Sequence, residues 1–239
     1  ESSTGEMSGA ELAGLFAAAW SLSRSNISLL MRSLGTFIYP RYAAADSPQS
    51  ALAEIRSGVD IVLELSLGLF IIVAALASPV LVWLKSAEYV PAAQLLLFFL
   101  AADLVRMVNY LHSSALLYRK HHLAYAAIPV TTWAMFTALC VILTPQFGLQ
   151  GIGVAYLGSF GCSIALSTVI VWRVLGRPDM GYLPRLGASI LAVGAAGLTC
   201  TRWPSASWAF VIVGAILLAR STVARQVALK IWKKIRRQR

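Results

Sequence analysis

Long apolar runs are the feature that most restricts what this chain can fold into. A hydrocarbon core about 30 Å thick is crossed by a helix of about 20 mostly apolar residues, and the sequence supplies such a stretch several times. Hydrophobic residues make up 58% of the 239 positions and charged residues only 13%, which is more apolar than an ordinary soluble domain. The runs are too long for barrel strands and do not alternate with period two. The sequence therefore predicts an all-α, polytopic bundle of transmembrane helices.

Seven crossings are predicted. Arg24, Asn26 and Arg32 interrupt the first one, for which a helix lying in the membrane interface is the alternative. The last one is short for a span, so Trp203 and Arg220 would have to anchor it at the two interfaces. The predicted crossings are 11–39, 59–84, 92–117, 123–144, 149–173, 183–201 and 205–221.

Basic residues are distributed unevenly over the connections between these crossings. Fifteen Lys and Arg residues fall on one side, eight of them between Arg220 and Arg239, whereas the other side has only Lys85 and Arg202. The positive-inside rule places the basic side in the cytoplasm and the N-terminus outside. The chain then divides into an extracytoplasmic segment at 1–10, a transmembrane bundle at 11–221 and a basic cytoplasmic tail at 222–239.

The basic tail has an amphipathic pattern. Its apolar residues Val223, Val227, Ile231 and Ile235 fall on one helical stripe, with Lys and Arg elsewhere. Such a helix is expected to lie on anionic lipid headgroups. Anchoring of this kind accounts for the charge, so nucleic-acid binding is not expected.

The sequence offers little for catalysis. It contains no G-x-S-x-G, H-E-x-x-H, P-loop or dinucleotide-binding pattern. The adjacent His121 and His122 sit beside Arg119 and Lys120, which fits a solvated turn better than a metal site. We therefore expect neither an enzyme nor a bound cofactor or metal.

Polar residues at membrane depth are the candidate functional groups. An ionisable side chain there costs about 2.5 to 3.5 kcal/mol on insertion scales and usually faces a partner or a wet cavity. Asp103, Arg106, Asn109 and His112 form one stripe on the helix predicted at 92–117. Asp103 and Arg106 can also satisfy each other as an internal pair. A packing role and a cavity role therefore both stay open for this stripe.

Two further helices contribute candidates. Arg24, Ser28 and Arg32 share one face of the first helix, where no acidic residue within a turn could pair with them. Glu64, in the second helix, is a candidate carrier of a coupling proton. Guanidinium groups bind phosphate in bidentate geometry, so a wet cavity lined with arginines suits an anion. The candidates are Arg24, Arg32 and Arg106 for phosphate, and Asn26, Glu64, Asp103, Asn109 and His112 for the cavity or for coupling.

The predicted helix at 149–173 has a face of small residues. Ala155, Ser159, Ser163 and Ser167 recur at four-residue steps. Small side chains allow helix backbones to approach closely in membranes. This face is therefore predicted to pack against another helix.

Several short stretches resemble the polysaccharide flippases, which translocate O-antigen and other lipid-linked oligosaccharides and belong to the multidrug/oligosaccharidyl-lipid/polysaccharide exporter superfamily. They are GLFAAAWSLSR at 14–24, the close of the first helix at Tyr39-Pro40-Arg41, EYVPAAQLL at 88–96 and FGLQGIGVAY at 147–156. The resemblance covers most of 11–175. It implies a two-lobed bundle with a central cationic cavity and alternating access.

The resemblance also implies a substrate and a location. The substrate would be a polyprenyl diphosphate sugar, moved across the bacterial cytoplasmic (inner) membrane for lipopolysaccharide or other surface polysaccharide. Arg24 and Arg106 would face the central cavity as phosphate-binding residues, with Arg32 nearer its cytoplasmic mouth.

The chain departs from that family in its number of crossings. Such transporters have twelve or fourteen, whereas the seven predicted here correspond to the later part. Because alternating access needs two lobes that rock about the site, a missing N-terminal lobe or a second copy is expected as a partner. Two other functions stay open: an organic-cation exporter of the same superfamily, with Glu64 and Asp103 dominating the cavity, and a non-transporting assembly subunit with every intramembrane charge paired.

Overall fold

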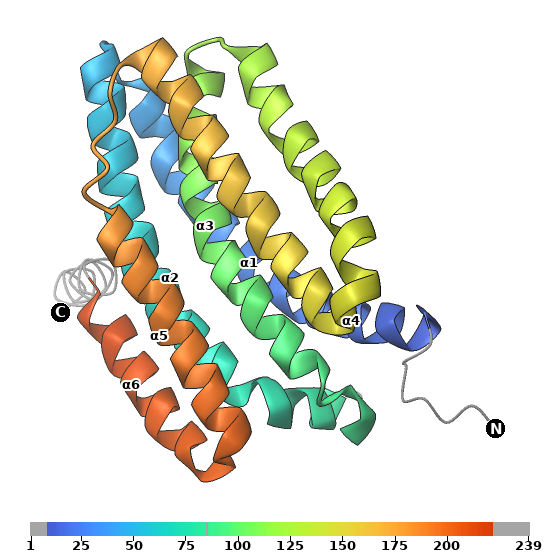
Figure 1. Ribbon diagram of the computed structural model, residues 1–239. Coiled ribbons are helices and arrows are strands. Elements are labelled where there is room, and N and C mark those ends of the chain that lie inside the picture. Colours follow the sequence, from blue (N-terminus) through green and yellow to red (C-terminus); the bar gives the residue numbers. More distant parts are fainter. Residues whose placement is uncertain (1–8, 85, 222–239) are drawn as a thin grey trace, which may run out of the picture.

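The computed structural model describes residues 9–84 and 86–221, without the side chains of Leu29 and Ser33, and every regular element in this part of the chain is helical. The predicted all-α bundle is therefore confirmed. In Figure 1 the third helix lies centrally, and the last two helices pack against the second at one side. The elements are α1 (Gly9–Ala43), α2 (Pro48–Leu84), the 3-10 turn Ala87–Tyr89, α3 (Ala92–Tyr118), α4 (His122–Leu175), α5 (Leu183–Arg202), the 3-10 turn Pro204–Ala206 and α6 (Ser207–Arg220).

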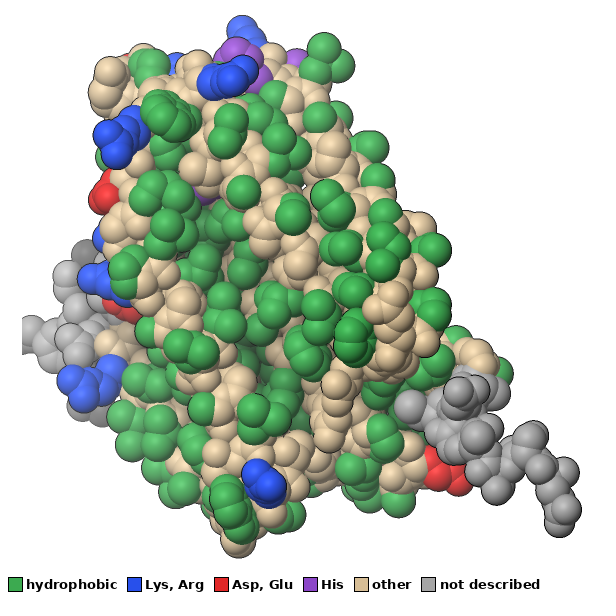
Figure 2. Space-filling model, in the orientation of Figure 1, with side chains coloured by type: hydrophobic (Ala, Val, Ile, Leu, Met, Phe, Trp, Pro, Cys, Tyr) green, Lys and Arg blue, Asp and Glu red, His purple; other side chains and the backbone are tan. Residues whose placement is uncertain are grey.

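Four of these helices, α2, α3, α4 and α5, are long and apolar enough to cross a membrane. Figure 2 shows hydrophobic side chains spread over the whole visible face, with Lys, Arg and His mainly at the upper end and along one edge. This is the surface of a membrane protein. Helix α1 is less apolar, and α6 has only 14 residues, or about 21 Å at the helical rise per residue. A crossing by either of these two stays a prediction.

The two predicted crossings at 123–144 and 149–173 are the two halves of α4. Gly148 breaks the helix with φ 55° and ψ −130°, and Figure 1 shows the halves folded back on each other. Gly151 lies against the first half so closely that a Cβ there would be 2.4 Å from the carbonyl oxygen of Leu143. The chain therefore reverses where the two apolar runs were separated in the sequence.

Substituting alanine at Gly148 is expected to destabilise the bend by roughly 1 to 3 kcal/mol, because its positive φ disfavours any L side chain. No atom lies within 4 Å of the added Cβ, so the penalty is conformational and not steric. Gly161→Ala is the matched control, because that glycine is helical and also has open space around it. Equilibrium unfolding in detergent would measure both variants. Equal stability of the two variants would contradict the conclusion that the bend requires the positive φ of Gly148.

Two helix ends differ from their predicted positions. The first helix continues through Pro40 to Ala43, whereas its close was predicted at Tyr39-Pro40-Arg41. The second begins at Pro48, eleven residues before the predicted 59. There Ser47 and Ser50 exchange side-chain to backbone hydrogen bonds of 3.1 Å each, in the manner of a capping box. Charged residues shortened the apolar run without ending the helix.

Helix α3 is the buried centre of the bundle. Its stretch long enough to span a membrane is 83% buried, the highest share among the four spanning candidates of the described chain. The second half of α4 packs on it through the small-residue face, all four members of which are buried. The close helix contact predicted for Ala155, Ser159, Ser163 and Ser167 is therefore confirmed. The predicted segment at 1–10, apart from its last two residues, and the predicted tail at 222–239 lie outside the described residues.

Candidate functional site

Asp103 begins the polar stripe of α3 and is completely buried. Ser23 of α1 donates a hydrogen bond of 2.5 Å to its Oδ2, and the Tyr156 hydroxyl of α4 donates to its Oδ1 over 3.4 Å. A guanidinium nitrogen of Arg106 lies 3.7 Å from the same Oδ1. The carboxylate thus ties α1, α3 and α4 together, and it does not itself line the pocket that its neighbour Arg106 lines.

Asn109 and His112 continue the stripe and are also buried. Asn109 donates from Nδ2 to Ser163 Oγ over 2.7 Å. His112 lies 3.4 Å from Ser167 Oγ and 3.4 Å from the Tyr182 hydroxyl. Asp103, Asn109 and His112 are thus buried in polar contacts between helices, which is the packing role that the sequence left open.

A pocket of about 270 Å³ opens beside this stripe, between α1, α3 and both halves of α4. We call it the α1–α3–α4 pocket. Arg106 and Asn109 are the two residues of the predicted stripe that line it, and no acidic side chain does. The other lining residues are Met31, Tyr110, Ser113, Tyr125, Ile128, Pro129, Thr132, Trp133 and Phe160.

Arg106 supplies the positive charge of this pocket. Its side chain is 33% exposed, its Cζ lies 5.8 Å from the centre of the Phe160 ring, and Nη1 lies 3.5 Å from the Tyr156 hydroxyl. The pairing with Asp103 is looser than a direct charge-assisted hydrogen bond, which is usually 2.7 to 2.9 Å long. The guanidinium therefore keeps donors available for a ligand.

Helix α1 borders the same pocket and carries the other two predicted arginines. Arg24 and Arg32 are exposed, and no ion pair joins either of them to another residue within 9–84 and 86–221. Because Ser23 contacts Asp103, the neighbouring Arg24 lies at the depth of the Asp103–Arg106 pair. Asn26 is satisfied by its own helix, since Nδ2 donates to the Leu22 carbonyl over 2.8 Å.

The exposed polar face of α1 extends beyond the arginines. Its hydroxyl groups donate to carbonyls of the same helix at 2.8 to 3.1 Å and leave the face small and polar. No other described helix covers the exposed members of this face, although α1 packs its opposite side on α3. The face consists of Ser21, Arg24, Ser25, Ser28, Arg32 and Thr36.

Glu64 lies apart from these residues. It lines a different groove, of about 520 Å³, between α1 and α2, together with Arg41, Arg56 and Asp60. The structure therefore does not bring Glu64 together with Arg106, and the groove that contains it holds charges of both signs.

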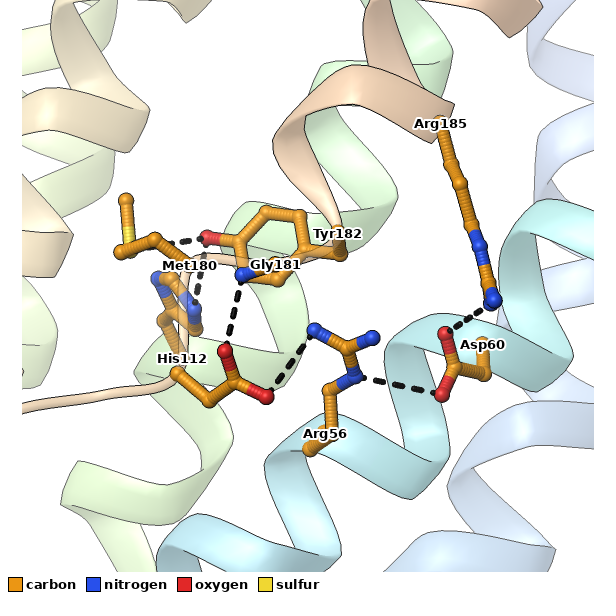
Figure 3. Close-up of polar contacts among 8 residues, drawn as sticks. Arg56, Asp60, His112, Met180, Gly181, Tyr182 and Arg185 are labelled. Atoms are coloured by element: carbon orange, nitrogen blue, oxygen red, sulfur yellow. Dashed lines mark hydrogen bonds and ion pairs between the residues drawn. The ribbon is translucent and has the colours of Figure 1, made fainter.

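An ionic network next to this groove holds the α4–α5 connection in place (Figure 3). Asp60 binds Arg56 at 3.2 Å and Arg185 at 2.9 Å, and Arg56 also binds Asp179 at 3.1 Å. Tyr182, at the end of this connection, covers His112. Burial raises the pKa of the Tyr182 phenol, so the phenol stays neutral at ordinary pH. The network fixes one end of the bundle around the polar stripe.

Several pocket and stripe partners had no signal in the sequence. Tyr156 lies inside the apolar stretch FGLQGIGVAY, and Trp133 and Tyr125 lie in the apolar run 123–144. Ser23 is an ordinary serine beside Arg24. Each acquires its role from a neighbour far away in the chain. Spacing along one helix does not reveal such partners.

No protein-family model, no curated protein and no solved structure matches this chain.

Proposed function

We propose that this chain is part of a transporter that flips a lipid-diphosphate-linked oligosaccharide across the bacterial cytoplasmic membrane for surface polysaccharide export. The observation that carries the proposal is the guanidinium of Arg106, near the middle of the spanning candidate α3, in a pocket whose lining contains no acid. A guanidinium fork binds phosphate oxygens in pairs. The polyprenyl part of such a substrate would stay in the surrounding lipid.

The acidic residues support an anionic substrate over a cationic one. An exporter of organic cations would present Asp103 and Glu64 to its substrate. Asp103 is instead buried and held by Ser23, Tyr156 and Arg106, and Glu64 lies in a groove that also contains two arginines. The available charge in the α1–α3–α4 pocket is positive.

The exposed polar face of α1 supports a larger assembly. Arg24 and Arg32 would be costly against hydrocarbon, and a subunit with only a structural role would be expected to pair them internally. They are left unpaired within the described residues. We propose that this face lines a wet cavity completed by an N-terminal lobe or a second copy, with the basic end of the bundle on the cytoplasmic side.

Complementation would test this function. Cells that lack their own flippase would receive the 239-residue chain or, separately, a version joined to an N-terminal lobe, and sugar-lipid translocation would be measured. Restoration by the two-lobed version alone is the expected result, because alternating access needs two lobes. Restoration by the short chain would point to a second copy as the partner. Failure of both versions, with normal membrane insertion, would contradict the proposal.

A further inference from the structure

We infer that the α1–α3–α4 pocket binds the first sugar ring of the substrate, beside the phosphate held by Arg106, and that Asn109 and Trp133 contact this sugar. The inference rests on the proposed function and specifies which part of the substrate the pocket recognises. The pocket volume of about 270 Å³ lies just below the roughly 300 to 1,000 Å³ typical of sites for drug-sized ligands. It therefore suits one ring and not a whole oligosaccharide.

The side-chain oxygen of Asn109 lacks a hydrogen-bond donor among the described residues. The Nδ2 of the same carboxamide is used by Ser163, while Oδ1 is buried and has no hydrogen-bond partner in this part of the chain. A buried acceptor without a partner is costly. A fully ionised phosphate offers only acceptor oxygens and cannot satisfy it. A sugar hydroxyl or an acetamido N–H is a donor and can.

Ser163 holds this carboxamide in one orientation. It accepts from Asn109 over 2.7 Å, and the Thr132 hydroxyl lies 2.6 Å from the same oxygen. Thr132 also lines the pocket. The three side chains come from α3 and from both halves of α4, so the polar wall is assembled only when these segments pack together.

The rest of the pocket wall is aromatic, whereas the wall at Asn109 is polar, and an aromatic wall also fits a sugar ring. Trp133, Phe160 and Tyr125 provide aromatic surface, and an aromatic ring carries negative charge on its face, which attracts the weakly positive C–H groups of a pyranose. Trp133 is 41% exposed. Edge contacts with Trp20 and Phe136, at centroid distances of 5.8 and 5.7 Å, hold its ring in position.

Arg106 lies between the polar wall at Asn109 and the aromatic wall. It lies at the aromatic wall, 5.8 Å from the Phe160 ring centre, and three residues before Asn109 on the same helix. A glycosyl phosphate has the matching arrangement, since its anionic group is attached directly to the sugar ring. A lipid tail would match poorly, because it offers no donor to Asn109.

The test compares three small probes on the full chain in phosphatidylcholine nanodiscs, using calorimetry. The probes are inorganic phosphate, glycerol 1-phosphate and N-acetylglucosamine 1-phosphate. The sugar phosphate is expected to bind about tenfold more tightly than the other two, which corresponds to about one good hydrogen bond plus ring contact. Asn109→Ala is expected to remove this preference while leaving the affinity for phosphate nearly unchanged.

Control variants separate the outcomes. Thr131→Ala should bind as the unaltered chain does, because its hydroxyl donates to its own helix and does not line the pocket. If Asn109→Ala fails to fold, Trp133→Ala takes its place, and it should also remove the sugar preference. Phosphate binding without a sugar preference, or a preference that survives the variants, would overturn this inference alone. Absence of binding by all three probes would overturn the proposed function as well.

Discussion

Arg106→Ala in the two-lobed transporter is expected to reduce sugar-lipid translocation at least about tenfold, since a hydrogen bond to a charged group contributes roughly 1.5 to 3 kcal/mol. Arg106 is the cationic residue that lines the α1–α3–α4 pocket, so its loss removes the donors that we propose bind phosphate. The substitution also leaves the buried Asp103 without its cationic neighbour. Translocation in flippase-deficient cells, normalised to the amount of protein in the membrane, would measure the effect.

Two companion variants separate binding from stability. Arg106→Lys keeps the charge but loses the planar fork, so it should restore only part of the activity. Arg106→Ala combined with Asp103→Asn removes the unpaired carboxylate, and it should recover stability while staying inactive. Full translocation by this double variant would show that Arg106 acts only as a partner of Asp103, and the phosphate-binding role would be lost.

Gly214→Leu is expected to separate α6 from α2 and to destabilise the folded chain by about 3 kcal/mol or more, at the upper end of the usual cost of overpacking. A Cβ at Gly214 would lie 2.7 Å from the carbonyl oxygen of Gly68, and a Cβ at Gly68 would lie 2.8 Å from the carbonyl oxygen of Gly214. The side chains of Ile72 and Leu218 are equally close, but they can rotate away, whereas the backbone oxygens cannot. Only a shift of the whole helix relieves the overlap.

Unfolding in mixed detergent and hydrogen exchange of the α6 amides would measure this separation. Gly187→Leu is the matched control, because that glycine is exposed in α5 and nothing lies within 4 Å of its added Cβ. The control should be at least as stable as the unaltered chain, since leucine favours a helix more than glycine does. If both variants unfold alike, close packing does not hold α6 in place.

The membrane class and most helix positions could be predicted from the sequence, because they depend on local composition. The predicted 92–117 corresponds to α3 at 92–118, and 183–201 to α5 at 183–202. The early start of α2 was missed because Arg56 and Asp60 end the apolar run, although the helix continues beyond it. The Ser47–Ser50 capping pair was the signal that could have located this start.

The candidate site could be predicted only in part, because a polar stripe shows which residues share a face and not what covers that face. Three-residue steps place Asp103, Arg106, Asn109 and His112 on one stripe of the helix. They did not distinguish Asp103, which is sealed among three helices, from Arg106, which reaches the pocket. Glu64 was grouped with them on charge alone and lies in another groove.

The sequence by itself determined that this chain is a helical membrane protein, that the apolar runs at 123–144 and 149–173 are separate, and which few charged residues lie within apolar helices. These properties follow from hydropathy and helical periodicity, each of which acts over a few residues. Only the tertiary structure decided that Ser23 and Tyr156 hydrogen-bond to Asp103, that Ser163 orients Asn109, and that Arg106 lines the pocket. Those assignments depend on contacts between residues far apart in the chain, which exist only after the helices have packed.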